Sequence, residues 1–264
     1  MPHRAIGIFD SGVGGLTVFK EISRVLPDEN LIYLGDTARV PYGTKSVETV
    51  RRYAMEAAGF LVDRGVKLLV VACNTASAVA LPCLRQFFNL PVIGVIEPGA
   101  RRAVESRNQR IGVIGTEGTI NSGRYPDAIR SLLPSAQIVS AACPLFVPLA
   151  EEGWANHEIS RLTALEYLRP LMAADIDTLV LGCTHYPLLH ETLQQVLGTN
   201  VTLVDSATET AKAVQQVFQQ KGLNYPGQGG RRDFFVTDVP DRFERVGQAF
   251  LGRSLGHVEQ VQID

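Results

Sequence analysis

The sequence has neither a long hydrophobic run nor an excess of either charge. Its longest uninterrupted apolar run extends from Leu68 to Cys73, far short of the roughly 20 residues that a membrane-spanning helix needs. Lys and Arg total 25, and Asp and Glu total 27. The surplus of positive charge that is typical of nucleic-acid-binding proteins is therefore missing. We expect neither a membrane nor a nucleic acid as a partner.

Signals of secretion, of disulfides and of metal sites are missing as well. The apolar stretch Ile6 to Phe9 ends at Asp10 and is too short for the hydrophobic part of a signal peptide. The four cysteines show no C-x-x-C spacing, and the segment from His190 lacks the H-E-x-x-H pattern of zinc proteases, so no zinc site is expected. We expect a cytoplasmic protein with reduced cysteines and no bound metal.

The length and composition are those of an ordinary globular protein. The 264 residues, 45% of them hydrophobic, suffice for about two domains. Short apolar runs alternate with longer stretches of helical periodicity, which is typical of an α/β protein with parallel strands. Strands are predicted near 5–9, 31–34, 67–72, 92–95, 111–115, 137–141, 178–182, 201–204, 233–237 and 258–261. Helices are predicted in the gaps, among them 45–63, 207–220 and 241–251.

Two sequence patterns occur twice at nearly the same offset. IGIFDSG from Ile6 is similar to IGVIGTEG from Ile111, and LLVVACNT from Leu68 is similar to TLVLGCTH from Thr178. Buried parallel strands resemble one another in any protein, but two such pairs at nearly equal offsets favour two similar α/β halves.

Small and polar residues follow the predicted strands, where open parallel sheets bind ligands. The glycine-rich run that starts at Gly12 could hold an anion through its backbone N–H groups. However, Thr17 occupies the position of the last glycine in G-x-G-x-x-G, and no Gly-Lys pair completes a phosphate-binding loop. A carboxylate is therefore a better candidate ligand than a nucleotide phosphate.

Two of the cysteines stand out from the others. Cys83 and Cys143 fit the common role of small buried hydrophobes. Cys73 and Cys183 each end an apolar strand and precede a predicted helix start, Asn-Thr after one and Thr-His after the other. The partial positive charge at a helix start favours the thiolate, the form of cysteine that acts as a base or a nucleophile.

A matched pair of cysteines favours proton transfer over acyl transfer. One Cys with one His would be typical of a covalent acyl intermediate. Two equivalent thiols, one from each half, could instead remove a proton from one face of a carbon and return another proton to the opposite face. A pyridoxal phosphate enzyme is disfavoured because none of the five lysines lies in a predicted strand-end cluster.

Five segments of the sequence are informative together: FDSGVGGLTV, YLGDTARVPYGTKS, VACNTASAVALP, VIGVIEPGA and LGCTHYPLL. They resemble the glutamate racemases of the Asp/Glu racemase family, which interconvert L- and D-glutamate without a cofactor. The resemblance covers Ile6 to about Ala207 and is looser beyond that point. It implies two α/β domains with mostly parallel sheets that face each other across a cleft, related by a pseudo-two-fold axis. The domains would comprise residues 1–98 with 208–264, and residues 99–207.

The resemblance also implies roles for individual residues. Cys73 and Cys183 would be the acid/base thiols, with Cys73 deprotonating D-glutamate and Cys183 deprotonating L-glutamate. Polar groups that would assist the sulfurs are Asp10, Asp36, Glu152 and His185. Substrate-binding positions would be Asp10, Ser11, Tyr42, Gly43, Asn74, Thr75, Thr116, Thr119, Thr184 and His185.

Plainer roles are open for three of these residues. Asp36 could cap a turn, His185 could be a buried imidazole with satisfied hydrogen bonds, and Glu152 could be exposed. Only the resemblance chooses Glu152 over the adjacent Glu151. Trp154 fits a core or interface position better than a catalytic one.

The resemblance further implies a homodimer, no cofactor, and a role in supplying D-glutamate for peptidoglycan. Alternative functions are a related racemase or isomerase of the same fold that acts on aspartate, hydantoins or maleate, and a non-catalytic amino-acid sensor. The sequences Asn-Thr-Ala-Ser after Cys73 and Thr-His-Tyr-Pro after Cys183 favour glutamate. The presence of both cysteines disfavours a sensor.

Overall fold

The strands form two separate sheets in which every neighbouring pair is parallel. The computed structural model describes residues 4–223, 227 and 229–263. The six-stranded sheet has the order β10-β9-β2-β1-β3-β4 and the four-stranded sheet has the order β6-β5-β7-β8. The strands are β1 (Ile6–Asp10), β2 (Leu31–Gly35), β3 (Leu68–Val71), β4 (Val92–Gly94), β5 (Arg110–Gly115), β6 (Gln137–Ala142), β7 (Thr178–Gly182), β8 (Thr202–Asp205), β9 (Arg232–Val236) and β10 (Val258–Gln260).

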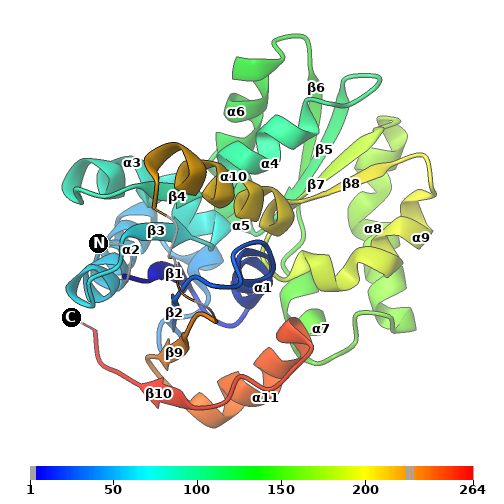
Figure 1. Ribbon diagram of the computed structural model, residues 1–264. Coiled ribbons are helices and arrows are strands. Elements are labelled where there is room, and N and C mark those ends of the chain that lie inside the picture. Colours follow the sequence, from blue (N-terminus) through cyan, green and yellow to red (C-terminus); the bar gives the residue numbers. More distant parts are fainter. Residues whose placement is uncertain (1–3, 224–226, 228, 264) are drawn as a thin grey trace.

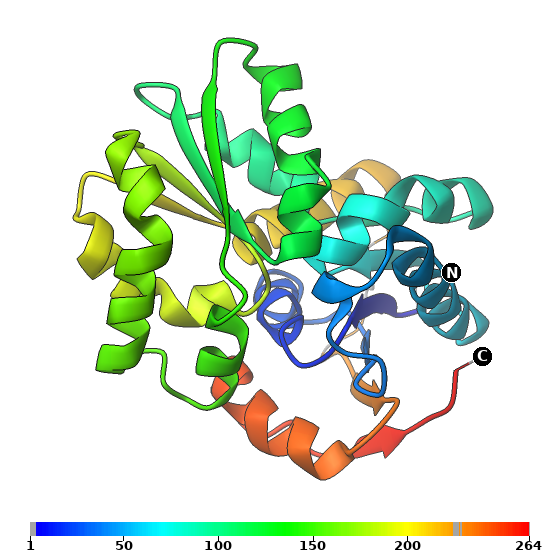
Figure 2. The ribbon, with the colours of Figure 1, turned by 180° about the vertical axis from the view of Figure 1, so that it is seen from behind.

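Helices cover both sheets (Figures 1 and 2). The α-helices are α1 (Leu16–Val25), α2 (Val47–Asp63), α3 (Asn74–Phe87), α4 (Ile96–Ala103), α5 (Glu117–Asn121), α6 (Arg124–Leu132), α7 (Phe146–Glu151), α8 (Glu158–Ala173), α9 (His190–Leu197), α10 (Ser206–Lys221) and α11 (Pro240–Leu251). Two 3-10 helices are η1 (Tyr42–Thr44) and η2 (Tyr186–Leu189).

The predicted fold class is confirmed, and each of the ten predicted strands lies within about two residues of its observed position. Central strands such as β1 and β7 are buried at every position, because helices cover both faces of a parallel sheet, and this is why they read as continuous apolar runs. The predicted helix 45–63 begins at Val47 because Ser46 caps it, its Oγ accepting a hydrogen bond from the backbone N–H of Thr49.

The prediction of a helix start directly after Cys183 is wrong. Pro187 has no N–H to donate to the carbonyl of Cys183, so the hydrogen bond that would close the first α-helical turn there is missing. The N–H of Tyr186 donates to that carbonyl at 3.1 Å instead. The chain passes through η2 before α9 begins at His190.

The carboxyl ends of the central strands are level in both sheets. Asp10 at the end of β1 pairs with Gly35 at the end of β2, and Gly115 at the end of β5 pairs with Gly182 at the end of β7. The residues that follow these strands, Cys183 among them, are therefore brought to one edge of each sheet.

One hydrophobic cluster continues from the first sheet into the second. It contains Ile6 and Ile8 of β1 together with Ile111 and Val113 of β5. Helix α10 lies between the two halves in Figure 1 and packs on both α1 and α4. The first sheet takes its strands from 6–94 and 232–260, and the second from 110–205. The domain boundaries after residues 98 and 207 fall inside α4 and α10, and they stay a prediction.

Within the described residues, no helix combines the length and the apolar character needed to cross a membrane. In the same residues, no group of three or more His, Cys, Asp or Glu side chains is placed to hold a metal ion.

Candidate active site

Cys73 lies at the start of α3 with its sulfur among the strand ends of the first sheet. It is the N-cap residue of that helix, and its Sγ accepts a hydrogen bond from the backbone N–H of Ala76 at 3.5 Å. The thiol donates to Ser11 Oγ at 3.8 Å. The helix start predicted for Cys73 is therefore confirmed, and Ser11 lies beside the sulfur.

The surroundings of Cys73 hold it as a thiol, contrary to the expectation that a helix start favours the thiolate. Burial raises the pKa of Cys73 to about 12, and the negative charge of Asp10 adds to the rise. The hydrogen bonds from Ala76 and with Ser11 offset only part of it. Desolvation of the sulfur thus outweighs the partial charge at the helix end.

Asp10 and Asn74 each present one polar atom that has no partner among the described residues. The Oδ2 atom of Asp10 accepts from the N–H of Gly12 at 3.0 Å, while its Oδ1 is buried and unpaired. The Oδ1 atom of Asn74 accepts from Tyr125 OH at 2.7 Å, while its Nδ2 is buried and unpaired. A free carboxylate oxygen and a free amide N–H₂ match the ammonium and carboxylate groups of an amino acid.

Cys183 begins a chain of polar contacts that reaches a distant helix. Its Sγ lies 3.9 Å from His185 Nδ1, and His185 Nε2 lies 3.0 Å from Glu151 Oε1. The other carboxylate oxygen of Glu151 accepts from Arg242 Nη2 at 2.9 Å. The hypothesis that His185 is a buried imidazole with satisfied hydrogen bonds is therefore correct, and one of its partners is the second cysteine.

The charges along this chain support one another. Burial alone would lower the pKa of His185, but its hydrogen bonds to Cys183 and Glu151 outweigh burial and raise it to about 10. Burial would likewise raise the pKa of Glu151, but His185 and Arg242 hold it below its ordinary value. Cys183 therefore has an imidazole with a raised pKa beside it, whereas the charge of Asp10 acts on Cys73.

The two cysteines share one electrostatic environment although they come from different sheets. Cys183 is close enough to Cys73 for a charge on its sulfur to raise the pKa of Cys73. The positive charge of His185 offsets part of the rise that burial causes in the pKa of Asp10. The site thus combines groups from both halves of the molecule.

Glycine brings the two halves into close contact beside the site. A Cβ atom on Gly14 would lie 2.3 Å from Thr184 Oγ1 and 2.4 Å from His185 Nδ1. Thr17, in the first turn of α1, donates a hydrogen bond to the carbonyl oxygen of Thr184 at 3.0 Å. The glycine-rich run after β1 therefore lets the backbone approach the other half of the protein.

Three threonines, one from the first half and two from the second, lie close together. Thr75 Oγ1 lies 2.9 Å from Thr116 Oγ1 and 3.2 Å from Thr119 Oγ1. Gly43 packs against Thr116, where an added Cβ would come within 2.7 Å of the threonine side chain. The structure brings these predicted binding residues together from both sheets.

Asp36 accepts hydrogen bonds from three nearby side chains. Its Oδ2 accepts hydrogen bonds from Tyr42 OH at 2.5 Å and from Arg39 Nε at 2.7 Å, and its Oδ1 accepts from Thr237 Oγ1 at 3.0 Å. Burial and the charge of Asp36 raise the pKa of Tyr42, with a further contribution from Cys73. Asp36 thus positions Tyr42 near the first cysteine.

Of the two adjacent glutamates, Glu151 contacts His185, and the role expected for Glu152 stays a prediction. Glu151 is the last residue of α7, and its carboxylate accepts the hydrogen bond from His185. Glu152 follows as the C-cap residue, and its side chain is exposed. One residue more along the chain rotates the side chain away from the site.

Sequence reasoning also missed three residues that touch the site. Arg242 binds Glu151, the ring of Phe250 packs edge-on against His185, and Tyr125 donates to Asn74. No local motif marks them. Trp154 is exposed and stacks on His157, outside the groups that surround the cysteines.

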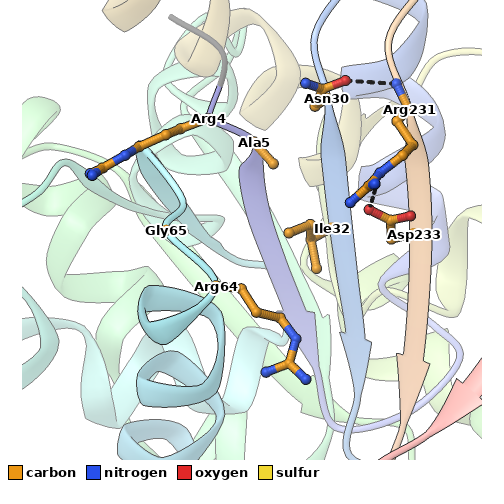
Figure 3. A pocket seen from close by; sticks show the side chains of 8 residues that line it. All are labelled: Arg4, Ala5, Asn30, Ile32, Arg64, Gly65, Arg231 and Asp233. Atoms are coloured by element: carbon orange, nitrogen blue, oxygen red, sulfur yellow. Dashed lines mark hydrogen bonds and ion pairs between the residues drawn. The ribbon is translucent and has the colours of Figure 1, made fainter. Parts of the chain in front are cut away.

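A cavity of about 470 Å³ lies at the opposite, amino-terminal edge of the first sheet (Figure 3). Arg4, Arg64 and Arg231 line it, but Arg231 forms an ion pair with Asp233 at 2.8 Å. The guanidinium of Arg64 lies over the ring of Phe60, and the side chain of Arg4 points away from the other two arginines in Figure 3. The three arginines do not converge on one ligand position.

The fold and site define an α/β protein in which each of two sheets contributes one cysteine to a shared polar site. A family model described as Asp/Glu/Hydantoin racemase matches residues 6–214, and the chain belongs to this family.

Individual relatives match the chain over nearly its whole length. A protein of Geobacter metallireducens named glutamate racemase is 59% identical over 266 residues, which covers 100% of this chain and 98% of the relative. The crystal structure of a glutamate racemase from Bacillus anthracis has a TM-score of 0.96 at 42% identity and covers 99% of this chain and 98% of that one. The glutamate racemase of Francisella tularensis in complex with D-glutamate has a TM-score of 0.94 at 38% identity, with coverage of 99% and 98%.

Proposed function

We propose that this protein interconverts L- and D-glutamate without a cofactor, with Cys73 and Cys183 as its two acid/base groups. The observation that supports the proposal is the presence of two thiols, one from each sheet, in a single site. The relatives named glutamate racemase and the solved relative that contains D-glutamate favour glutamate as the substrate. Supply of D-glutamate for peptidoglycan, a cytoplasmic location and a homodimeric state belong to the same proposal.

Each turnover moves two protons. With L-glutamate bound, the thiolate of Cys183 takes the Cα proton, and the electron pair left on Cα delocalises into the α-carboxylate. The thiol of Cys73 then donates its proton to the opposite face of Cα, which yields D-glutamate. The reaction from D-glutamate reverses the roles, and the two sulfurs end each turnover with their protonation states exchanged.

The raised pKa of Cys73 suits the conversion of L- to D-glutamate, in which Cys73 donates a proton. In the reverse conversion Cys73 must act as a base, so its pKa must fall. At neutral pH the sulfur is a thiol and is ready to donate. To act as a base it must lose this proton, which the carboxylate of Asp10 opposes. A substrate ammonium group on the free Oδ1 of Asp10 would neutralise that carboxylate and so lower the pKa of the thiol.

Basicity of the sulfur alone cannot remove a Cα proton, which is held far more tightly than a thiol proton. Donors that face the developing charge are each worth about 3 to 4 kcal/mol in enzymes generally. We assign the free amide of Asn74 to the α-carboxylate, because its Nδ2 has no partner among the described residues. The hydroxyl groups of Thr75, Thr116 and Thr119 and the backbone near Gly43 are assigned to the substrate's carboxylates.

The test is to incubate the purified protein with L-glutamate in D₂O without pyridoxal phosphate, and to follow optical rotation and Cα deuterium. We expect loss of rotation, deuterium in the D-glutamate formed, and protium in the L-glutamate not yet converted. A single base shared by both faces would instead return the original proton to the product, or place deuterium in both enantiomers.

Variants connect the activity to the cysteines. Cys73→Ala and Cys183→Ala should each abolish racemisation, whereas Cys83→Ala, in which a cysteine of α3 outside the site is changed, should keep it. Parental activity in either of the first two variants would disprove the two-thiol mechanism. Activity on L-aspartate or a hydantoin without activity on L-glutamate would favour the alternative racemases, and tight glutamate binding without any turnover would favour a sensor.

A further inference from the structure

Helix α11 reaches the site from a part of the chain beyond the 6–214 match to the family model. It lies beside α7 in both views of the molecule (Figures 1 and 2). Arg242 in its first turn binds Glu151, and Phe250 near its end packs on His185 with ring centroids 5.3 Å apart at 87°. The helix therefore touches both members of the Glu151–His185 pair.

The other face of α11 is fixed to the first half of the protein. Phe243 and Leu251 are buried there, and Gly247 lies against α1, where an added Cβ would come within 2.8 Å of Leu16. The contact between Arg242 and Glu151 therefore spans the two halves, since α7 follows β6 in the second sheet.

The negative charge of Glu151 would be unfavourable at its position in the fold without a cation nearby. It is the last residue of α7, and the carbonyl groups at a helix end repel a carboxylate. Its Oε1 is used by His185, and its Oε2 is the atom that Arg242 binds. The arginine therefore neutralises the carboxylate and fixes the orientation in which Oε1 faces the imidazole.

We propose that Arg242 is a positioning residue for the Cys183 side of the reaction, acting through Glu151 on His185. The inference rests on the proposed racemase function. Arg242 itself touches neither cysteine: its effect passes along the ordered contacts Arg242–Glu151, Glu151–His185 and His185–Cys183. It gives the C-terminal helix a part in catalysis that the strand-end motifs do not contain.

Several charged groups act on His185 from different elements. Cys183 lies beside it at the end of β7, Glu151 approaches from α7, and Asp10 from the end of β1. Arg242 of α11 meets the imidazole only through Glu151. Loss of the arginine leaves Glu151 less well oriented toward the imidazole, and it also removes a positive charge that opposes the imidazolium.

The experiment compares Arg242→Gln with Arg245→Gln, which removes the same charge from another exposed position of the same helix, where the structure shows no contact with Glu151. We expect Arg242→Gln to reduce kcat/KM about tenfold, as for loss of one hydrogen bond between charged groups. We also expect it to move the basic limb of the pH profile, which Arg245→Gln should leave in place. Arg245→Gln should stay within about twofold of the parent, and Arg242→Lys should recover part of the loss.

A double variant separates positioning from a general structural effect. If Arg242 acts through Glu151, the variant Arg242→Gln, Glu151→Gln should be no slower than Glu151→Gln alone. Multiplication of the two effects, or equality of Arg242→Gln with Arg245→Gln, would overturn the inference. Glutamate racemisation by the parent and by Arg245→Gln shows that the proposed function stands in either case, so the two failures are distinguishable.

Discussion

The two cysteines occupy corresponding places in two similar halves, yet their surroundings differ in charge and in backbone structure. Cys73 caps an α-helix and lies near the carboxylate of Asp10. Cys183 precedes a 3-10 helix and lies beside the imidazole of His185. The backbone repeats the arrangement, whereas the side chains do not.

This difference fits the task of treating two mirror-image substrates at one site. The Cα proton of each enantiomer meets a different sulfur, while the ammonium and carboxylate groups must use common partners. A carboxylate near one sulfur can bind the ammonium in both directions. An imidazolium near the other can stabilise a thiolate, since opposite charges at short distance favour each other.

Because L- and D-glutamate have equal free energies in water, kcat/KM must be equal in the two directions for every variant. Unequal effects on the two cysteines therefore appear in the separate kcat and KM values and in isotope effects. Measurements of these quantities can contradict the proposal that the two cysteines differ in their surroundings and roles.

Among the residues that support the two cysteines, the largest effect is expected from Asp10→Asn, because Asp10 serves both directions. Loss of the carboxylate removes the proposed ammonium partner and should lower kcat/KM by about 30-fold to 1000-fold, which corresponds to about 2 to 4 kcal/mol. The measurement is racemisation of each enantiomer by the variant.

Asp63→Asn, at the exposed end of α2, serves as the control and should match the parent. A loss below about threefold for Asp10→Asn would show that the unpaired Oδ1 has no part in binding or catalysis.

A smaller and directional effect is expected from Glu151→Gln, with Glu152→Gln as its neighbour control. Glu151 raises the pKa of His185, so its loss should lower that pKa, move the basic limb of the pH profile to lower pH and reduce kcat/KM by about 10-fold to 100-fold. Glu152→Gln should leave the rate within about twofold.

The side of the reaction that Glu151 serves can be identified with Cα-deuterated substrates. If the variant slows the step at Cys183, the isotope effect from L-glutamate should increase and that from D-glutamate should decrease. Equal changes in both directions would mean that Glu151 does not act through Cys183.

An intermediate effect on packing is expected from Gly14→Ala. The added methyl group would overlap Thr184 and His185, and such overpacking costs about 1 to 3 kcal/mol. Because the overlap falls on the Cys183 side, activity should fall together with the free energy of unfolding.

Gly59→Ala in α2 is the matched change, since nothing lies within 4 Å of the added Cβ, and Ala in a helix interior is better than Gly by about 1 kcal/mol. The free energy of unfolding of both variants is measured by urea unfolding. A Gly14→Ala protein as stable as Gly59→Ala would contradict the close approach of the two halves.

The elements and the two cysteines could be predicted from the sequence because their signals are local. Buried parallel strands leave short apolar runs, and the residues that follow them meet at one edge of the sheet. The contrast between the two cysteines could not be predicted from the matching motifs. It depends on Pro187 blocking one helix start and on burial overriding the helix charge at Cys73.

The supporting residues could not be predicted because they depend on distant contacts and on helix rotation. Glu151 and Glu152 are equivalent in sequence, and only the end of α7 decides which one faces His185. Arg242 lies 91 residues from Glu151 along the chain. A single sequence contains no signal for such a pairing.

The smallest expected effect is on the pH dependence of stability, and it tests the charge at Cys183 without any assay of activity. The pKa of His185 is about 10 in the folded protein against an ordinary 6.5. Its contribution to stability is therefore complete below about pH 6.5 and is lost as the pH rises through about 10. Replacement by Asn removes this contribution.

The stability difference between the parent and His185→Asn should therefore shrink as the pH rises from about 7 to about 9, by at most about 1.4 kcal/mol per pH unit. Urea unfolding at several pH values below the range in which Cys73 titrates gives the comparison. If the curves for the parent and His185→Asn stay parallel, His185 is not held protonated by Cys183 and Glu151, and the electrostatic contrast between the two cysteines is lost with it.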